Sequence, residues 1–370
     1  MSKDAVNLLV ITSVLLAIGL VMLFSASAIY AGEGKVGDYT LFLKKQLVWI
    51  TISVVGLFIA SKIHYSYWIK ARYPILAITI ISLLLVLIPG VAPKINGARR
   101  WFRFSDLSFQ PSEMAKLAMV IFLSASISLN PDRIKNFKHG FLPLFAVVSF
   151  ISALILVEPD IGTASFILMV SSLILIVGGV KLNNILPLAA GAFVLTGTVA
   201  LFAMPHFKDR IMVFLDPSRD PLGKGYNINQ SFIALGSGGW FGVGLGKGIS
   251  KLFFLPEVHS DFIFPVIGEE LGFIGSIVIM GLFAYLLYIG YRIMQKTSDR
   301  FSFLLAFGII FFIILQAAMN IAVVTGAIPA KGIPLPFISF GGSSLLFIMF
   351  GLGILVNIAN NSHQKIYNAG

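Results

Sequence analysis

Long uninterrupted apolar runs constrain this chain more than any other feature. Ten of them, each about 17 residues or longer, lie near residues 6–27, 46–63, 73–91, 111–129, 141–158, 162–180, 185–204, 262–294, 303–324 and 343–359. A bilayer core about 30 Å thick needs an α-helix of about 20 apolar residues to cross it, because only a helix satisfies its own backbone hydrogen bonds there. We therefore expect an all-α polytopic membrane protein of about ten transmembrane helices, with residues 1–370 forming a single integral membrane domain.

The composition agrees with this prediction. Hydrophobic residues make up 57% of the chain and charged residues 12%, whereas soluble domains carry about 25% charged residues. The first apolar run follows Lys3 and ends at small residues, as in a secretory signal peptide. Because that run is long enough to span a bilayer and many spans follow it, we expect an uncleaved first helix.

Several kinds of site are excluded by what the sequence lacks. There is no cysteine, and the five histidines are not spaced as zinc ligands. The glycine-rich tract at residues 236–248 fits neither a phosphate-binding loop nor a dinucleotide fingerprint. We therefore expect no zinc, haem or nucleotide cofactor. The net charge of +11 does not indicate nucleic acid, because no soluble basic domain is present to bind it.

Two polar connections stand out, at residues 92–110 and 205–261. The second and larger one separates the seventh and eighth predicted spans. It contains NINQSFIAL, which predicts a short amphipathic helix, and Lys247 in the glycine-rich tract. An even number of spans places both termini on one side, but basic residues occur on both sides, so charge alone does not set the orientation. Basic residues in these two loops indicate an anionic ligand or, equally, pairing with nearby aspartates and lipid phosphates.

Asp261 is the first candidate for chemistry, because it lies where the large loop meets the eighth span. A carboxylate at the membrane edge is costly and is a functional candidate by default. It is placed to accept a proton as a general base. The alternative is a helix cap, since aspartate is favoured at helix N-termini.

Glu113 and Lys116 form the second candidate site. Pro111 predicts the start of a helix, and residues three apart share one helix face. Lys116 then lies about one turn inside the membrane and needs a partner. A buried ion pair that fixes helix packing is the favoured interpretation, and a ligand contact is the alternative.

Four further carboxylates are placed near span ends. Glu158 and Asp160 flank a proline at a predicted tight hairpin, where either caps a helix or binds a cation through oxygen. Glu269 and Glu270 are interpreted as packing or pairing groups. Residues 329–344 predict irregular backbone between two spans, which is tolerated at membrane depth only where it is buried in protein or lines a wet cavity.

Taken together, these motifs resemble the SEDS family of bacterial cell-wall glycan polymerases over nearly the whole chain. The matching stretches, in the family's order, are residues 96–101, 110–116, 158–163, 216–225, 255–272 and 334–344. Ser260 and Phe340 stand where the family usually has threonine and tyrosine. Several motifs look more like the division-type branch of the family than the elongation-type branch.

The resemblance implies a substrate, a site and partners. The substrate would be lipid II, joined by inverting β-1,4 glycosyl transfer with release of undecaprenyl diphosphate. Asp261 would be the essential acidic residue, supported by the Glu113–Lys116 pair. We expect Arg99, Arg100, Arg210 and Lys247 to bind the diphosphate, with a divalent cation such as Mg²⁺ or Mn²⁺ held by Asp261, Glu158 or Asp160.

The resemblance also implies the bacterial inner membrane, cytoplasmic termini and an extracytoplasmic large loop. Its implied partners are a class B penicillin-binding protein, which is a transpeptidase, and other divisome or elongasome membrane proteins. Two competing functions fit the same spans and charges: a lipid II flippase, and a non-catalytic scaffold for a wall synthase.

Overall fold

The computed structural model describes residues 1–32, 38–95, 97–104, 107–203, 205–216, 223, 225–252, 258–329 and 332–367. The helices are α1 (Lys3–Gly32), α2 (Leu41–Lys62), α3 (Tyr67–Leu87), α4 (Pro111–Leu129), α5 (Leu142–Val157), α6 (Ile161–Val177), α7 (Leu182–Ala203), α8 (Pro205–Leu215), α9 (Tyr226–Ser237), α10 (Ile263–Gln295), α11 (Arg300–Val324) and α12 (Gly342–Tyr367). Two short strands, β1 (Phe102–Phe104) and β2 (Leu107–Phe109), form an antiparallel hairpin. A 3₁₀ turn, η1 (Arg133–Lys135), and a π turn, η2 (Phe137–Phe141), precede α5.

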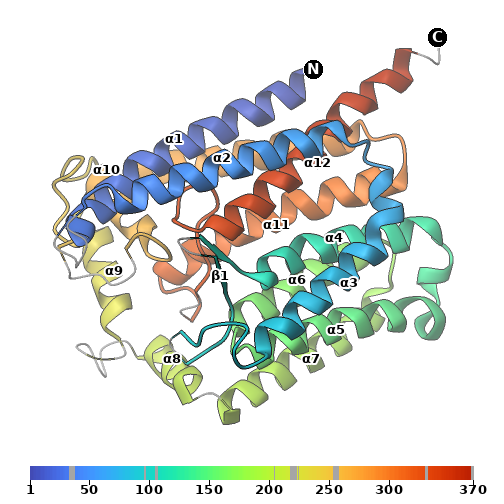
Figure 1. Ribbon diagram of the computed structural model, residues 1–370, viewed down its shortest axis with the longest axis horizontal. Helices are drawn as coiled ribbons and strands as arrows, with labels where there is room; N and C mark the ends of the chain where they lie inside the picture. The colour runs from blue at the N-terminus through green and yellow to red at the C-terminus, as the bar shows by residue number, and fades with distance from the viewer. Residues whose placement is uncertain are drawn as a thin grey trace.

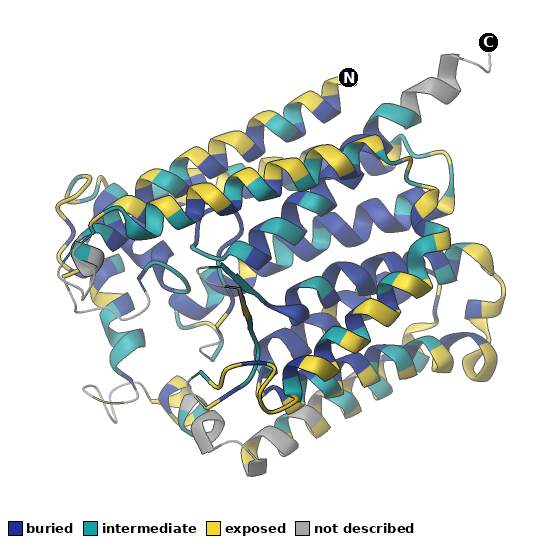
Figure 2. Cartoon of the chain, in the orientation of Figure 1, coloured by how far each residue is buried: buried dark blue, intermediate teal, exposed yellow. Residues whose placement is uncertain are grey.

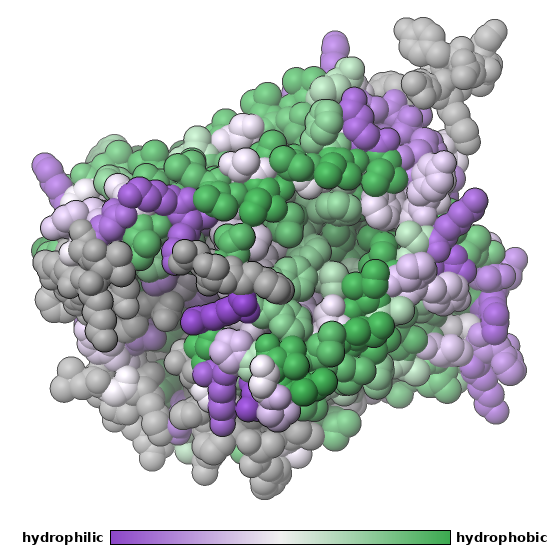
Figure 3. All heavy atoms as spheres, viewed as in Figure 1, coloured by the Kyte–Doolittle hydropathy of each residue, from purple (hydrophilic) through white to green (hydrophobic). Residues whose placement is uncertain are grey.

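The predicted membrane architecture is confirmed. Within the described residues, eight helices have the length and hydropathy of membrane spans: α1, α2, α3, α4, α5 with its preceding turn, α10, α11 and α12. The apolar helix α6 is shorter, at 17 residues, and α7 coincides with the remaining predicted span. These ten helices run side by side through the bundle (Figure 1). Apolar side chains cover the middle of the visible face, and hydrophilic ones gather toward its ends (Figure 3).

The centre of the bundle consists of α4, α11 and α12, most of whose residues are buried. Helix α4 packs on α3, α6 and α11, while α12 packs on α2. The peripheral helices α1, α2 and α3 bury one side and expose apolar residues on the other (Figure 2). Such exposed apolar surface is expected where lipid is the solvent.

Both termini lie at the same end of the bundle, as an even number of crossings requires (Figure 1). The backbone N–H of Ser2 donates a hydrogen bond to the Asn360 side chain at 2.9 Å. The β-hairpin, α8 and α9 lie toward the opposite end. The predicted short amphipathic helix is α9, and α8 is an additional helix that the hydrophobic pattern did not predict.

Helix α10 is interrupted near its start, and the glycine-rich tract packs into the break. Gly272 has φ 70° and ψ −168°, a conformation open essentially to glycine alone. The backbone N–H groups of Phe273 and Ile274 donate to the carbonyls of Gly239 and Trp240 at 2.9 and 3.1 Å. A Cβ atom on Gly272 would lie 2.3 Å from the backbone nitrogen of Gly242. The close backbone contact therefore requires glycine at this point.

Candidate functional site

A polar cavity of about 440 Å³ lies at the end of the bundle opposite the termini. It brings together the 92–110 connection, the Glu158–Gly162 hairpin, the segment before α10 and the segment before α12. Its lining includes four predicted site residues, Asp261, Glu113, Arg100 and Asp160. Residues far apart in the sequence therefore form one site.

Asp261 lies on the wall of this cavity rather than at a helix cap. The N-cap of α10 is Phe262, and it makes no side-chain capping hydrogen bond. One carboxylate oxygen of Asp261 lies against Gly332, where an added Cβ would be 3.1 Å from Oδ2. Asp261 is half-buried, so its carboxylate is held by protein on one side and reaches the cavity on the other.

The segment that carries Asp261 is fixed to the 332–341 segment by buried hydrogen bonds. The Asn320 side chain of α11 donates to the carbonyls of both Asp261 and Ile333, each at 2.8 Å. The Ser339 hydroxyl donates to the Ser260 carbonyl, and the Phe340 N–H donates to the His259 carbonyl at 2.8 Å. The irregular 332–341 backbone is thus buried against the site and lines a cavity, as the sequence predicted.

Glu113 and Lys116 form the predicted buried ion pair, with Lys116 Nζ 2.7 Å from Glu113 Oε1. Lys116 also donates to Gln316 Oε1 at 3.1 Å. The Gln316 amide donates in turn to the Pro334 carbonyl at 3.0 Å and to the Ser344 hydroxyl at 3.1 Å. Because Glu113 also lines the cavity, the pair both packs α4 on α11 and connects to the wall beside Asp261.

Two arginines of the 92–110 connection face the cavity. Arg100 is oriented by the hairpin after α5: its Nε donates to the Glu158 carbonyl at 2.8 Å, and an Nη donates to the Pro159 carbonyl. A guanidinium has five N–H donors, so others remain for a ligand. Arg103, on β1, lines the same cavity. Arg99 is outside the lining, so only one of the two adjacent arginines that were predicted reaches it.

Four helix N-termini converge on this cavity. Gln110 and Asp160 are the N-cap residues of α4 and α6, Asp261 precedes α10, and Gly341 precedes α12. All four residues belong to the lining. A helix N-terminus carries a partial positive charge and unpaired N–H groups, which makes it a favourable place for anions. Together with the arginines, this arrangement suits a negatively charged ligand such as a diphosphate.

The two hairpin carboxylates differ in their surroundings. Asp160 caps α6 by accepting from the Thr163 N–H and hydroxyl at 3.0 and 2.9 Å. The Glu158 carboxyl is fully buried, and neither oxygen has a hydrogen-bond partner within the described structure. Burial, and secondarily the charge of Asp160, raises the pKa of Glu158 to about 9. A neutral, buried carboxyl is a poor cation ligand.

The carboxylates around the cavity do not form a cation site by themselves. Within the described part of the chain, no three His, Asp or Glu side chains are close enough to hold a metal ion together. A divalent cation here would therefore take most of its oxygen ligands from a phosphate-bearing substrate, as Mg²⁺ commonly does. Asp261 and Asp160 are the lining residues suited to supply the others.

Of the two other predicted diphosphate ligands, Lys247 lies away from the cavity, and the Arg210 side chain is not described by the structure. Lys247 is exposed on the glycine-rich tract and does not line it. The side chain of Arg210, on α8, lies outside the described structure, as do residues 96, 217–222, 224 and 255–257 of the matching motifs. Backbone N–H groups of the glycine-rich tract are already hydrogen-bonded within the protein: those of Gly246 and Ile249 donate to the Glu270 and Glu269 carboxylates at 3.1 and 2.8 Å. These two N–H groups are therefore not available to a phosphate.

The interpretation of Glu269 and Glu270 as pairing groups is confirmed. Glu270 forms a fully buried ion pair with Lys251 at 2.7 Å and accepts from the Ser25 hydroxyl. Both glutamates thereby anchor the glycine-rich tract to α10 and α1.

Some site residues were missed by sequence reasoning. Arg103, Gln110, Gln316, Asn320 and Ser344 either line the cavity or fix its wall. Gln316 and Asn320 did carry a signal, since polar amides inside an apolar span indicate a buried partner. Arg103 carried none that separated it from the other basic residues of its loop.

These observations define the class of protein: a polytopic membrane protein whose acidic and basic groups meet in a cavity at one end of its helical bundle. A family profile described as cell cycle protein, covering FtsW, RodA and SpoVE, matches residues 6–364. The chain belongs to this family, the SEDS family, as the motifs predicted.

Relatives in this family match along nearly the full length of the chain. A probable peptidoglycan glycosyltransferase FtsW from Trichlorobacter lovleyi is 43% identical over 357 residues, which cover 96% of this chain and 93% of that protein. Stage V sporulation protein E of Bacillus subtilis is 41% identical over 356 residues, which cover 96% of this chain and 96% of that protein.

Solved structures show the same fold. One, described as the structural coordination of polymerization and crosslinking by a peptidoglycan synthase complex, has a TM-score of 0.77 at 26% identity and covers 97% of this chain and 98% of its own. The rod shape determining protein RodA of Thermus thermophilus has a TM-score of 0.69 at 24% identity, with 97% of each chain covered. The latter similarity concerns the fold alone.

Proposed function

We propose that this protein is a peptidoglycan glycosyltransferase that joins lipid II units into glycan strands by β-1,4 glycosyl transfer. The observation that carries the proposal is the shared cavity, whose lining brings together Asp261, Arg100, Arg103 and residues at four helix N-termini. The names of the similar proteins from Trichlorobacter lovleyi and other bacteria support the same activity.

In this mechanism Asp261 is the general base. The 4-hydroxyl of the GlcNAc of lipid II is a weak nucleophile, and Asp261 accepts its proton as it attacks the anomeric carbon of the growing glycan. A positioned base contributes about 10²–10⁴-fold to such a step. The bond to undecaprenyl diphosphate breaks with inversion, and the departing diphosphate needs its charge stabilised.

Arg100, Arg103 and the helix N-termini supply that stabilisation. Arg100 is held by two backbone carbonyls, so little reorganisation is needed when charge develops on the leaving oxygen. Asp261 and Asp160 are the residues that would hold a divalent cation, which would supply further charge neutralisation for the diphosphate.

The cellular setting follows from the same proposal. The cavity end faces the outside of the bacterial cytoplasmic membrane, and both termini face the cytoplasm. The relevant partner is a class B penicillin-binding protein of a divisome or elongasome, which crosslinks the new strand. The similarity to a structure from a peptidoglycan synthase complex supports this partner.

The test is glycan polymerisation from lipid II by purified protein in detergent, with and without the class B partner. Asp261→Asn should lower the rate by about 10²–10⁴-fold with an unchanged melting temperature. The matched control is Asp132→Asn, which removes an exposed carboxylate paired with Lys135. Polymer formed by Asp261→Asn at the wild-type rate would remove the base assignment.

The same assay separates the competing functions. A flippase moves labelled lipid II across the membrane of sealed vesicles and makes no polymer. In detergent there is no membrane separating two compartments, so polymer formed there is evidence of glycosyl transfer rather than transport. A scaffold predicts that Asp261→Asn supports growth as well as wild type does.

A further inference from the structure

A second cavity, of about 280 Å³, lies at the other end of the bundle, between α3, α4 and the turns before α5. It includes Leu129 and Asn130 at the end of α4 and Pro143 at the start of α5. The catalytic cavity lies at the opposite ends of these two helices. Along α4 the nearest lining residues of the two cavities are Glu113 and Phe122, nine residues apart, which is about 14 Å at 1.5 Å per residue.

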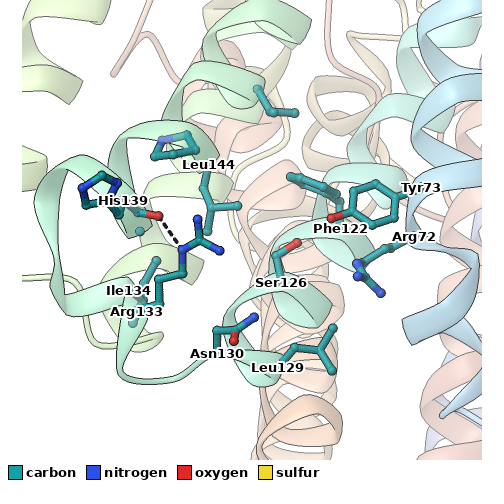
Figure 4. A pocket seen from close by; sticks show the side chains of 13 residues that line it. Arg72, Tyr73, Phe122, Ser126, Leu129, Asn130, Arg133, Ile134, His139 and Leu144 are labelled. Carbon is teal, nitrogen blue, oxygen red and sulfur yellow. Dashed lines mark hydrogen bonds between the residues drawn. The ribbon is translucent and has the colours of Figure 1, made fainter.

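One part of the lining is basic and polar. Arg72 and Arg133 contribute guanidinium groups, and Ser126, Asn130 and His139 contribute further hydrogen-bonding groups. Figure 4 shows Arg133 on the η1–α5 side and Arg72 on α3, with Ser126 and Asn130 of α4 between them. No Asp or Glu belongs to the described lining.

Both guanidinium groups are oriented by the protein, and among the described residues neither forms an ion pair with an Asp or Glu side chain. Arg72 donates to the Ile69 carbonyl at 2.6 Å, lies over the Tyr73 ring at 4.3 Å, and has a buried Nε without a hydrogen-bond partner. Arg133 donates its Nε to the His139 carbonyl at 2.7 Å. The neighbouring acid, Asp132, is paired instead with Lys135 at 2.9 Å.

The other part of the lining is apolar. Tyr73 and Phe122 pack edge to face with ring centroids 6.2 Å apart, and Leu129, Leu144 and Val147 extend the apolar wall. A free phosphate ion would gain nothing from contact with this apolar wall. A molecule with an anionic head and a hydrocarbon tail would contact both the basic and the apolar parts of the lining.

We propose that this cavity binds an anionic phospholipid of the adjacent leaflet. The headgroup phosphate lies between Arg72 and Arg133, and the acyl chains continue along the exposed apolar surfaces of α3 and α5. Basic pockets between transmembrane helices at the membrane–water border recognise anionic lipid headgroups in this way. In this arrangement the cavity of about 280 Å³ holds the headgroup end of the lipid, and the acyl chains lie outside it. The site is independent of the proposed glycosyl transfer.

The experiment measures lipid retention by native mass spectrometry and the melting temperature in detergent. The probes are dioleoyl phosphatidylglycerol, dioleoyl phosphatidylethanolamine and inorganic phosphate. We expect wild type to retain phosphatidylglycerol and to melt at a higher temperature in its presence. The double variant Arg72→Gln/Arg133→Gln should bind it at least tenfold more weakly, because both positive charges that attract the headgroup phosphate are lost.

The matched control is Lys70→Gln/Lys138→Gln, which removes the same charge from α3 and η2 outside the cavity. It should retain the lipid as wild type does. Should the double arginine variant fail to fold, Arg133→Gln alone, at an exposed position, gives the same comparison at reduced amplitude.

Three results would overturn the proposal. Equal loss in the lysine control would indicate a general charge effect, and equal retention of phosphatidylethanolamine would exclude recognition of the anionic head. Stabilisation by inorganic phosphate equal to that by phosphatidylglycerol would assign the cavity to a free anion.

Discussion

Gly332→Ala tests whether the position of the Asp261 carboxylate, and not only its presence, determines the rate. Among the described residues other than its chain neighbours, a Cβ built on Gly332 has one atom within 4 Å, Asp261 Oδ2 at 3.1 Å. The substitution therefore adds one methyl group directly against the proposed base. Alanine needs no unusual backbone angle here, since Gly332 is not among the glycines with positive φ.

The expected magnitude follows from this contact. Ordinary van der Waals contact begins at about 3.4 Å, so the carboxylate must move by a few tenths of an ångström. A misplacement of about 1 Å can cost about 10²-fold in rate. We therefore expect polymerisation by Gly332→Ala to fall by roughly tenfold, less than for Asp261→Asn, with a melting temperature within a few degrees of wild type.

The matched control is Gly341→Ala in the same cavity. Its Cβ would lie 3.6 Å from the Pro334 Cγ and 3.7 Å from the Ser344 Cβ, which is ordinary contact. The assay is the initial rate of glycan polymerisation from lipid II at saturating substrate. An unchanged rate for Gly332→Ala, or equal losses for both alanine variants, would refute the argument that the Asp261 position sets the rate.

Three other predictions concern stability. First, the melting temperature of Glu158→Gln should exceed that of wild type by a margin that grows as pH rises from 5 to 8. The folded-state pKa of Glu158 is raised to about 9, so over this range the wild-type carboxyl is protonated when folded and ionised when unfolded, and wild type loses up to about 1.4 kcal/mol of stability per pH unit. A difference in melting temperature that stays constant across that range would contradict the buried neutral carboxyl. Second, Lys116→Met should destabilise the folded protein by about 3–5 kcal/mol, because it leaves the Glu113 carboxylate buried without its cation. Adding Glu113→Gln should restore the melting temperature but not polymerisation. A double variant as unstable as Lys116→Met would contradict a stabilising role of the ion pair. Third, Gly272→Ala should lower the free energy of unfolding by at least about 1–3 kcal/mol, because its Cβ would clash with the Gly242 backbone. Limited proteolysis should then cleave the glycine-rich tract more readily than in wild type. An unaltered digestion pattern would contradict the packing of this tract against α10.

The sequence by itself determined the membrane architecture. The hydrocarbon thickness sets the length of each apolar run, so the pattern located every spanning helix, although single ends differ from the structure by up to eight residues, as at the end of α12. Helix α4, predicted at 111–129, occupies Pro111–Leu129, because the proline at its first turn marks the start. The Glu113–Lys116 pair was predictable for a similar reason, since both members lie on one helix face and neither tolerates burial alone.

Only the tertiary structure decided which polar residues share a cavity. Arg99 and Arg100 are adjacent and equally charged, but only Arg100 lines the site, because the carbonyls of the distant 158–159 hairpin hold its guanidinium there. Lys247 looked equivalent in sequence, but its loop is anchored away from the cavity by Glu269 and Glu270. Hydrophobic length is a local property that a linear pattern records, whereas the convergence of four helix N-termini depends on how α4, α6, α10 and α12 pack against one another.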